Sequence, residues 1–177
     1  MIKHLIRMID VFKSKKKIMR KAKQLGKNII INDKVKINSN TYLGSNIGIN
    51  GLTIREEGEV MIGNNVGIAK GCLIFAGNHD YKTGLPYGKN NIYKKVEIQD
   101  NVWIGQNVTI LGAVTIGEGA VIQAGSVVVF DIPKLALAGG NPAKPFKYRD
   151  EKVYEEMKKN KNYYKFKAKK RYSINSD

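Results

Sequence analysis

A period of six residues in the aliphatic side chains constrains the fold of this chain more than any other feature. Within each of three runs, aliphatic residues recur every six positions, and a companion series two residues earlier is β-branched or small with few exceptions. An α-helix repeats every 3.6 residues and would scatter these positions around its axis, whereas short strands separated by turns would point them all inward. The thirteen aliphatic positions are Ile31, Ile37, Leu43 and Ile49, then Ile62, Ile68 and Ile74, then Ile98, Ile104, Ile110, Ile116, Ile122 and Val128.

The repeat predicts an all-β solenoid, a parallel β-helix of triangular coils that fills residues 28–143. An ordinary β-sandwich would produce this spacing in one or two strands by alternation, but not at thirteen positions. The register slips once, because Ile49 and Ile62 are thirteen residues apart. We interpret the slip as a one-residue bulge at the corner between Gly51 and Gly58.

Between Ile74 and Ile98 the repeat lapses, and a polar, aromatic loop over residues 75–97 replaces it. Insertions in a regular solenoid fall on one face and tend to carry function. This loop holds His79, the one histidine of the scaffold, and imidazole is the side chain suited to accept a proton near neutral pH. The alternative is an ordinary surface histidine. Either Asp80 or a backbone carbonyl could orient the imidazole ring. The loop also holds three tyrosines that either face a sugar or pack the loop, and the sequence does not distinguish among them: Tyr81, Tyr87 and Tyr93.

The formal net charge of +16 resides in the two flanks. Residues 1–27 carry ten basic residues and one acidic, residues 28–143 carry nine of each, and residues 144–177 carry twelve basic and five acidic. We expect a basic amphipathic helix over 1–27 and a basic helical tail over 144–177. The N-terminal apolar stripe either lies on an anionic membrane or caps the open end of the solenoid. We favour capping as the role of the stripe, and we expect the basic side chains to attract polyanions. That stripe consists of Ile2, Leu5, Ile6, Ile9 and Phe12.

Four C-terminal motifs of the repeat resemble the hexapeptide-repeat acyltransferases, a family with a left-handed parallel β-helix. They are the stretches at 102–108 (VWIGQNV), 117–128 (GEGAVIQAGSVV), 131–133 (DIP) and 140–144 (GNPAK). The resemblance covers about residues 28–149 and is closest to galactoside, maltose and nodulation-factor acetyltransferases and to capsule or O-antigen O-acetyltransferases. It implies the left hand of the coils, acetyl-CoA as acyl donor and a closed homotrimer.

The same resemblance implies roles for individual residues. His79 is the expected catalytic base. The chain departs from the family pattern at Val129-Phe130, where relatives often have a Thr-Lys pair that contacts a phosphate of the coenzyme. The backbone at Gly105 and Gln106 is expected to contact coenzyme A, with one amide meeting the thioester oxyanion. The remaining expectations are acceptor binding by Asn50, Asn78 and Trp103, and coenzyme binding by Ala124, Gly125, Lys144 and Lys147.

These observations predict an acetyl-CoA-dependent sugar O-acetyltransferase that acts by direct transfer on a bacterial surface polysaccharide or its precursor. Two alternatives stay open: an amino-sugar N-acetyltransferase and a non-catalytic β-helix scaffold. Cys72 occupies a small-residue position of the repeat and is expected to be a buried structural thiol, not a nucleophile. We expect no metal site, because two histidines and one cysteine do not form a zinc-binding set. Nucleic acid is not an expected partner, since the scaffold is neutral and lacks a recognised motif. The expected location is the cytoplasm, with peripheral attachment at the inner face of the membrane as an option for the basic flanks.

Overall fold

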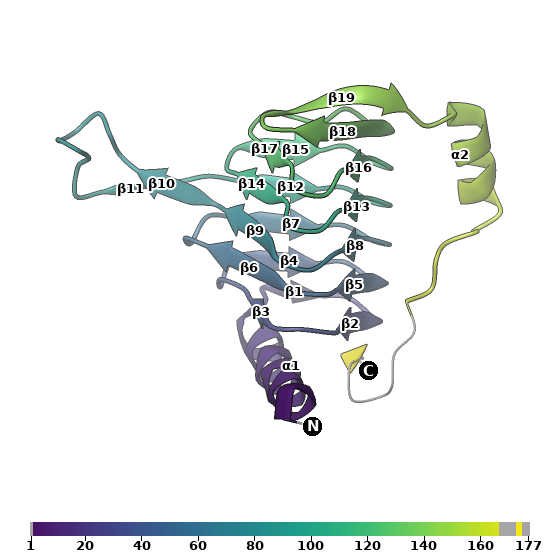
Figure 1. Ribbon diagram of the computed structural model, residues 1–177, viewed down its shortest axis with the longest axis horizontal. Coiled ribbons are helices and arrows are strands. Elements are labelled where there is room, and N and C mark those ends of the chain that lie inside the picture. The colour runs from purple at the N-terminus through teal and green to yellow at the C-terminus, as the bar shows by residue number, and fades with distance from the viewer. Residues whose placement is uncertain (1, 167–172, 175–177) are drawn as a thin grey trace.

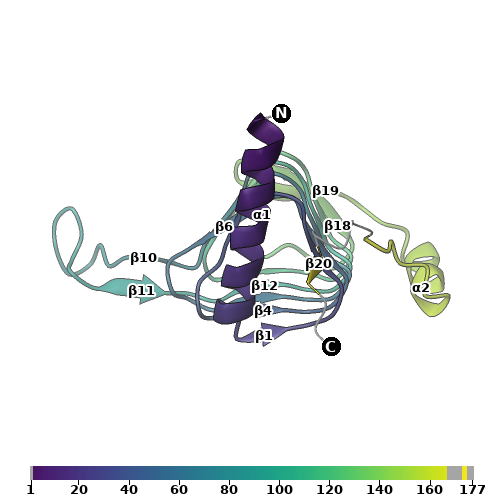
Figure 2. The same ribbon diagram turned by 90° about the horizontal axis from the view of Figure 1, so that it is seen from below.

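The computed structural model describes residues 2–166 and 173–174, with only the backbone at residues 2–4 and 173. It is a solenoid of short parallel strands stacked in coils, with a helix at each flank and one long hairpin that leaves the stack (Figure 1). Three sheets form the sides of a triangular cross-section (Figure 2). The predicted parallel β-helix is therefore confirmed.

Each sheet is named here after its first strand in the chain. The β1 sheet contains β1 (Gln24–Leu25), β4 (Thr41–Leu43), β7 (Val60–Ile62), β12 (Val96–Ile98) and β15 (Val114–Ile116). The β2 sheet contains β2 (Ile29–Ile31), β5 (Ile47–Ile49), β8 (Gly67–Ile68), β13 (Trp103–Ile104), β16 (Val121–Ile122), β18 (Ala136–Gly140), β19 (Ala143–Tyr148) and β20 (Ser173–Ile174). The β3 sheet contains β3 (Val35–Lys36), β6 (Leu52–Arg55), β9 (Cys72–Phe75), β14 (Thr109–Leu111) and β17 (Val127–Val128).

The core is the narrow interior that the repeat predicted. All thirteen positions of the aliphatic series are at most 4% exposed, and the companion series, including Thr41 and Ser126, is buried with it. Seen from the N-terminal end in Figure 2, the chain passes counterclockwise from the β1 sheet to the β2 sheet and then to the β3 sheet as it recedes. The solenoid is therefore left-handed, as the family resemblance implied.

The register slip is larger than the single bulge that the sequence suggested. A regular coil has 18 residues, as between the paired Ile29 and Ile47, but Leu52 lies 17 residues after its partner Val35, and Cys72 lies 20 after Leu52. One residue is thus missing before β6, and two are added after it. The buried side chain of Asn38 holds this enlarged corner by donating to the carbonyl oxygens of Glu56 (2.7 Å) and Gly58 (2.8 Å).

Helix α1 (Ile2–Lys21) packs across the N-terminal end of the solenoid, but with a different face from the one expected. Val11 and Ile18 are at most 2% exposed and belong to the core, and Ser14 Oγ accepts a hydrogen bond from the Val35 N–H at 2.8 Å. The predicted capping stripe points away from the solenoid. Its described side chains are Leu5, Ile6, Ile9 and Phe12, each at least 45% exposed, and the side chain of Ile2 lies outside the described residues.

The C-terminal end of the solenoid is closed by the antiparallel pair of β18 and β19. The expected boundary at residue 143 cuts this pair, so the scaffold continues to Tyr148. Helix α2 (Glu151–Lys159) follows, with Asp150 as its N-cap, and residues 162–166 form neither helix nor strand. β20 then pairs antiparallel with β2 at the opposite end of the stack. Neither helix in the described part of the chain has the length and hydropathy needed to cross a bilayer.

Candidate active site

His79 lies on the hairpin that leaves the solenoid at the corner between the β3 and β1 sheets (Figures 1 and 2). Strands β10 (Gly77–His79) and β11 (Asn91–Tyr93) pair antiparallel, with His79 opposite Asn91. The base of the hairpin is fixed by the Lys94 N–H, which donates to the Ala76 carbonyl at 3.0 Å. Gly58 of the enlarged corner makes room for this base, since a Cβ there would collide with the carbonyl oxygens of Ala76 and Lys94.

The imidazole of His79 is exposed and stacks on the ring of Tyr87, with centroids 4.1 Å apart and planes inclined by 9°. Tyr87 is thus the loop tyrosine that supports the histidine. Asn78 is exposed, and its Oδ1 accepts the His79 backbone N–H at 2.9 Å, which fixes the side chain of Asn78 beside the histidine. The Asp80 carboxylate accepts the Lys82 N–H at 3.0 Å, so it shapes the turn and does not orient the imidazole.

The expected coenzyme-binding residues stack at the corner between the β2 and β3 sheets. The Gly105 N–H donates to the Ile122 carbonyl (2.8 Å), and the Gly125 N–H donates to the Gln106 carbonyl (2.7 Å). The Gly105 amide is therefore already used, whereas the Gln106 N–H has no partner among the described residues. A Cβ at Gly105 would lie 2.6 Å from the Ala124 nitrogen, so coil stacking explains this glycine.

Gly125 is different, because the space beside it is open. Its φ is +74°, a conformation that favours glycine, and no atom lies within 4 Å of where a Cβ would be. Ala124 is likewise exposed. The corner therefore presents backbone and small side chains to solvent. Of the two amides that the sequence suggested as oxyanion donor, the one available is that of Gln106.

Trp103 and Asn50 lie over the β2 sheet and share one groove. Trp103 is 58% exposed between Gly67 and Val121 of the neighbouring strands. Asn50 follows β5 and accepts a hydrogen bond from Asn32 Nδ2 at 2.8 Å. Both residues line a groove of about 580 Å³ that lies between the β2 sheet and the C-terminal segment.

The C-terminal segment supplies aromatic lining that the sequence did not assign to the site. The Phe166 ring lies over Gly48 and Gly67, where a Cβ would contact it, and it packs edge-on against Tyr164 with centroids 5.0 Å apart. The glycines at the same outward position of two consecutive coils were the sequence signal for a bulky cover. The other lining residues of this segment include Tyr154, Met157 and Tyr163.

A ladder of asparagine side chains holds this segment at the corner between the β1 and β2 sheets. Four asparagines in successive coils share a left-handed backbone conformation, with φ between 56° and 61°: Asn28, Asn46, Asn65 and Asn101. The side-chain amide of each of the first three donates to the side-chain oxygen of the next asparagine at 2.8–3.0 Å. The amide of Asn101, at the top, donates to the Tyr154 hydroxyl at 2.8 Å. Asn28 and Asn46 face the segment at the other end of the ladder. Asn46 Nδ2 donates to the Tyr164 carbonyl at 2.9 Å, which secures the chain beyond α2.

Glu118 anchors α2 at the top of the ladder. Its carboxylate accepts hydrogen bonds from Lys158 Nζ (2.6 Å) and the Tyr154 hydroxyl (2.9 Å). Partial burial acts to raise the pKa of Glu118, but these hydrogen bonds and the charges of Lys158 and Lys134 outweigh it and hold the pKa below its usual value. The pKa of Lys158 is raised, chiefly by its hydrogen bond to Glu118. Burial, followed by Glu118, raises the pKa of Tyr154, so its hydroxyl keeps its proton.

Lys144 and Lys147 lie exposed on β19, at the C-terminal end of the stack. Lys144 pairs with Gly139, and Lys147 pairs with Leu137. Lys147 lines a second hollow of about 820 Å³, together with Trp103. One of the two lysines therefore faces the same side of the molecule as the tryptophan.

Cys72 is buried, 2% exposed, with its Sγ within hydrogen-bond distance of the carbonyl oxygens of Gly105 (3.2 Å) and Ala69 (3.3 Å). Burial raises the pKa of the thiol, so thiolate chemistry is disfavoured there. Among the side chains that the structure describes, those of residues 5–166 and 174, no three histidine, cysteine or carboxylate groups gather as a metal site would need.

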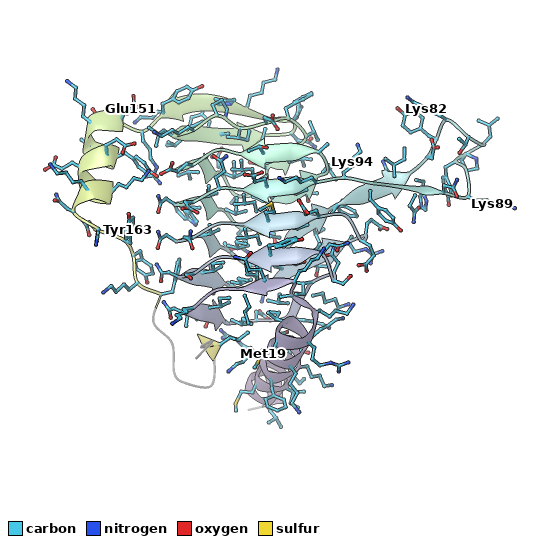
Figure 3. All side chains as sticks on the ribbon, turned by 180° about the vertical axis from the view of Figure 1, so that it is seen from behind. Met19, Lys82, Lys89, Lys94, Glu151 and Tyr163 are labelled. Atoms are coloured by element: carbon cyan, nitrogen blue, oxygen red, sulfur yellow. The ribbon has the colours of Figure 1, made fainter. Side chains whose placement is uncertain are left out.

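His79 and Trp103 do not meet within one chain. The hairpin leaves the corner opposite the β2 sheet, and Figure 3 shows Lys82 and Lys89 of the hairpin on the other side of the solenoid from Glu151 and Tyr163. Neither hollow over the β2 sheet has His79 in its lining. A site that combines the two residues therefore requires a second chain.

The chain matches known proteins over most of this architecture. Residues 95–129 match the family described as bacterial transferase hexapeptide (six repeats). The galactoside O-acetyltransferase of Escherichia coli (strain K12) is 38% identical over 107 residues, 60% of this chain and 53% of that protein. The chain spans 42% and 59% of the length of two further relatives, from Schizosaccharomyces pombe and Saccharomyces cerevisiae.

Two solved structures resemble this chain both in fold and in sequence. A maltose O-acetyltransferase from Clostridium difficile 630 is 31% identical, with a TM-score of 0.68 over 76% of this chain and 73% of that chain. A galactoside acetyltransferase in complex with coenzyme A is 30% identical, with a TM-score of 0.58 over 84% of this chain and 67% of that chain. The similarity thus extends well beyond the 35 residues of the family match.

Proposed function

Because the chain belongs to the hexapeptide-repeat transferase family, we propose that it is an acetyl-CoA-dependent sugar O-acetyltransferase with His79 as general base. The observation that carries the proposal is the position of His79. Its side chain is exposed on a hairpin that projects from an otherwise regular solenoid, and its imidazole stacks on Tyr87. The similarity to sugar O-acetyltransferases supplies the reaction class.

The proposed reaction is direct transfer of the acetyl group. His79 takes the proton from an acceptor hydroxyl, whose oxygen attacks the thioester carbonyl carbon. The Gln106 N–H donates to the oxyanion that forms on the carbonyl oxygen. When the C–S bond breaks, the sulfur of coenzyme A leaves with the electron pair and takes the proton back from His79. Cys72 has no part in this sequence, because its buried thiol is not a nucleophile.

The coenzyme is proposed to lie along the open corner formed by Ala124 and Gly125. A pantetheine arm needs an apolar, closely approachable surface, and the empty space beside Gly125 offers one. Lys144 and Lys147 then supply positive charge for the nucleotide phosphates near the end of the stack. Gly105 serves the stacking of the coils beneath this surface.

The acceptor is proposed to lie between His79 of one chain and the groove over the β2 sheet of a neighbour. Trp103 offers an exposed ring for a sugar face, and Asn50 and Asn78 offer amides for its hydroxyls. This arrangement is satisfied by a closed trimer, in which each hairpin reaches the next chain. A bacterial surface polysaccharide or its precursor is the proposed acceptor, with an amino sugar as the alternative.

The test is turnover of the His79→Ala variant, measured as thiol release from acetyl-CoA with a panel of neutral, amino and acidic sugars. Turnover should fall about 10²- to 10⁴-fold, with coenzyme affinity nearly unchanged. Tyr87→Phe is the matched control, because it keeps the stacked ring and should retain most of the activity. A His79→Ala enzyme with most of its turnover would contradict the assignment of the base. Absence of both coenzyme binding and thiol release in the unmodified protein would favour the non-catalytic scaffold.

A further inference from the structure

Helix α1 has two apolar faces, and only one of them is used by the solenoid. Val11 and Ile18 point into the core. At about 100° per residue, Leu5, Ile9 and Phe12 fall on the opposite side of the helix. These three side chains and Ile6 beside them are 45–59% exposed, so a cluster of four large apolar residues faces solvent.

The cluster lies where a partner can reach it. Figure 2 shows α1 lying across the N-terminal end of the solenoid, with its N-terminal end projecting beyond the outline of the coils, so the sheets do not cover its outer face. The residues that fix the helix to the stack lie on the face opposite to the cluster: Arg7, whose Nε donates to the Asn32 carbonyl at 2.7 Å, Ser14 and Ile18. Met8 and Asp10, on the flanks of the helix, are half-buried.

The exposed face changes from apolar to basic along the helix. Lys13, Lys16 and Arg20 fall within the same sector as the apolar cluster and are exposed. The Lys16 ammonium lies 4.7 Å from the centre of the Phe12 ring, where the two parts of the face meet. Asp10 is the one acidic residue among positions 1–27, which carry ten lysines and arginines.

We propose that this face of α1 binds the surface of an anionic lipid bilayer. The occupant must accept large apolar side chains and several positive charges side by side, and the boundary between acyl chains and phosphate headgroups does both. Leu5, Ile6, Ile9 and Phe12 enter the apolar side of that boundary. Lys13, Lys16 and Arg20 extend their chains to the phosphates.

A second copy of the same face is a poorer occupant. Packing two such helices against each other would bring the basic groups of both chains together, and the exposed side of α1 offers no carboxylate to neutralise them. A bilayer with anionic headgroups complements the charge as well as the apolar cluster. The attachment is peripheral, since the helix lies against the solenoid through Val11 and Ile18. The proposal is independent of the acetyltransferase chemistry.

The experiment is co-sedimentation of the full-length protein with vesicles of phosphatidylcholine alone or with about 30% phosphatidylglycerol. The protein should bind the anionic vesicles and lose affinity as salt is raised. Ile6→Ser with Ile9→Ser should weaken binding at least about 10-fold, because two exposed apolar side chains no longer enter the boundary. A second pair, Leu5→Ser with Phe12→Ser, should do the same. The matched control is Leu85→Ser, which removes a leucine that is 98% exposed on the hairpin, and it should bind as the unmodified protein does.

Charge is tested separately with Lys13→Gln, Lys16→Gln and Arg20→Gln combined. The triple variant should lose the preference for anionic vesicles, since each basic residue near the surface contributes about five-fold in affinity. Equal binding to both vesicle types, or serine pairs that sediment as the unmodified protein does, would overturn the proposal. So would light scattering in the absence of lipid that shows a smaller assembly for both serine pairs, because the face would then be a protein interface.

Discussion

Gly58→Ala should displace the hairpin that carries His79. A Cβ at this position would overlap the carbonyl oxygens of Ala76 and Lys94, which are backbone atoms that cannot turn away. The hairpin base or the enlarged corner must therefore move. Overpacking of this kind costs about 1–3 kcal/mol, which corresponds to a melting temperature roughly 2–12 °C lower for a chain of this size. A catalytic group misplaced by about 1 Å loses on the order of 100-fold in rate, so turnover should fall by about 10- to 100-fold.

The assay combines thermal unfolding with steady-state kinetics. Because the proposed coenzyme corner lies at the junction of the β2 and β3 sheets, away from the hairpin base, the KM for acetyl-CoA should change little. Gly67→Ala is the matched control for stability alone, since its nearest neighbours would be the side chains of Phe166 at 3.3 Å and Trp103 at 3.6 Å, and side chains can shift. A Gly58→Ala enzyme with unchanged melting temperature and turnover would refute the argument. A loss of coenzyme affinity equal to the loss of turnover would refute the separation of the two sites.

Two further predictions concern the interior and the anchor of α2. Cys72→Ser should keep nearly full turnover in the thiol-release assay and lower the free energy of unfolding by about 1 kcal/mol. The hydroxyl retains the contact with the Gly105 carbonyl but is more costly to bury than the thiol. A large loss of turnover would contradict the structural role of the thiol. Glu118→Gln should reduce the protection of the α2 amides from hydrogen exchange by about 5- to 30-fold, through the loss of about 1–2 kcal/mol in charged hydrogen bonds. Folding lowers the pKa of Glu118 below 4.5, so the stability that its carboxylate contributes is present above that pH and is lost as the pH falls further. Folding raises the pKa of Lys158 above 10.5, so the stability that its ammonium contributes is lost only above that pH. A protection factor of the α2 amides that is the same at pH 7 and at pH 3 would contradict this account.

The sequence predicted the scaffold because one physical requirement repeats along it. A narrow triangular interior accepts an aliphatic side chain at the same place in every strand, so the period of six determined the coils and their core. The size of the register slip was not predictable, since it depends on how Asn38 and the hairpin base fill the corner beside Gly58. The relation of α1 to the solenoid was also missed, because the helix carries two apolar faces and the sequence pattern was stronger for the exposed one.

The candidate site was predictable only in part. His79 could be found because it interrupts a regular repeat, but its stacking on Tyr87 depends on the turn geometry of the hairpin. The Gly105 amide was a candidate donor until the structure showed it bonded to Ile122. The lining contributed by Tyr164 and Phe166 depends on contacts more than 60 residues apart in the chain. Gly48 and Gly67 signal that something bulky covers them, but the sequence does not identify the residues that do so.

The most direct test of the proposed site asks whether His79 of one chain works with Trp103 of another. Chains carrying His79→Ala and chains carrying Trp103→Ala, each inactive or nearly so alone, are co-expressed with different tags, and mixed assemblies are isolated. In every closed trimer that contains both variants, one of the three interfaces pairs an intact His79 with an intact Trp103, so about one third of the sites should regain activity. Recovery of about one third of the unmodified turnover is the predicted result. Mixed assemblies no more active than the two variants alone would show that the site does not combine residues of neighbouring chains.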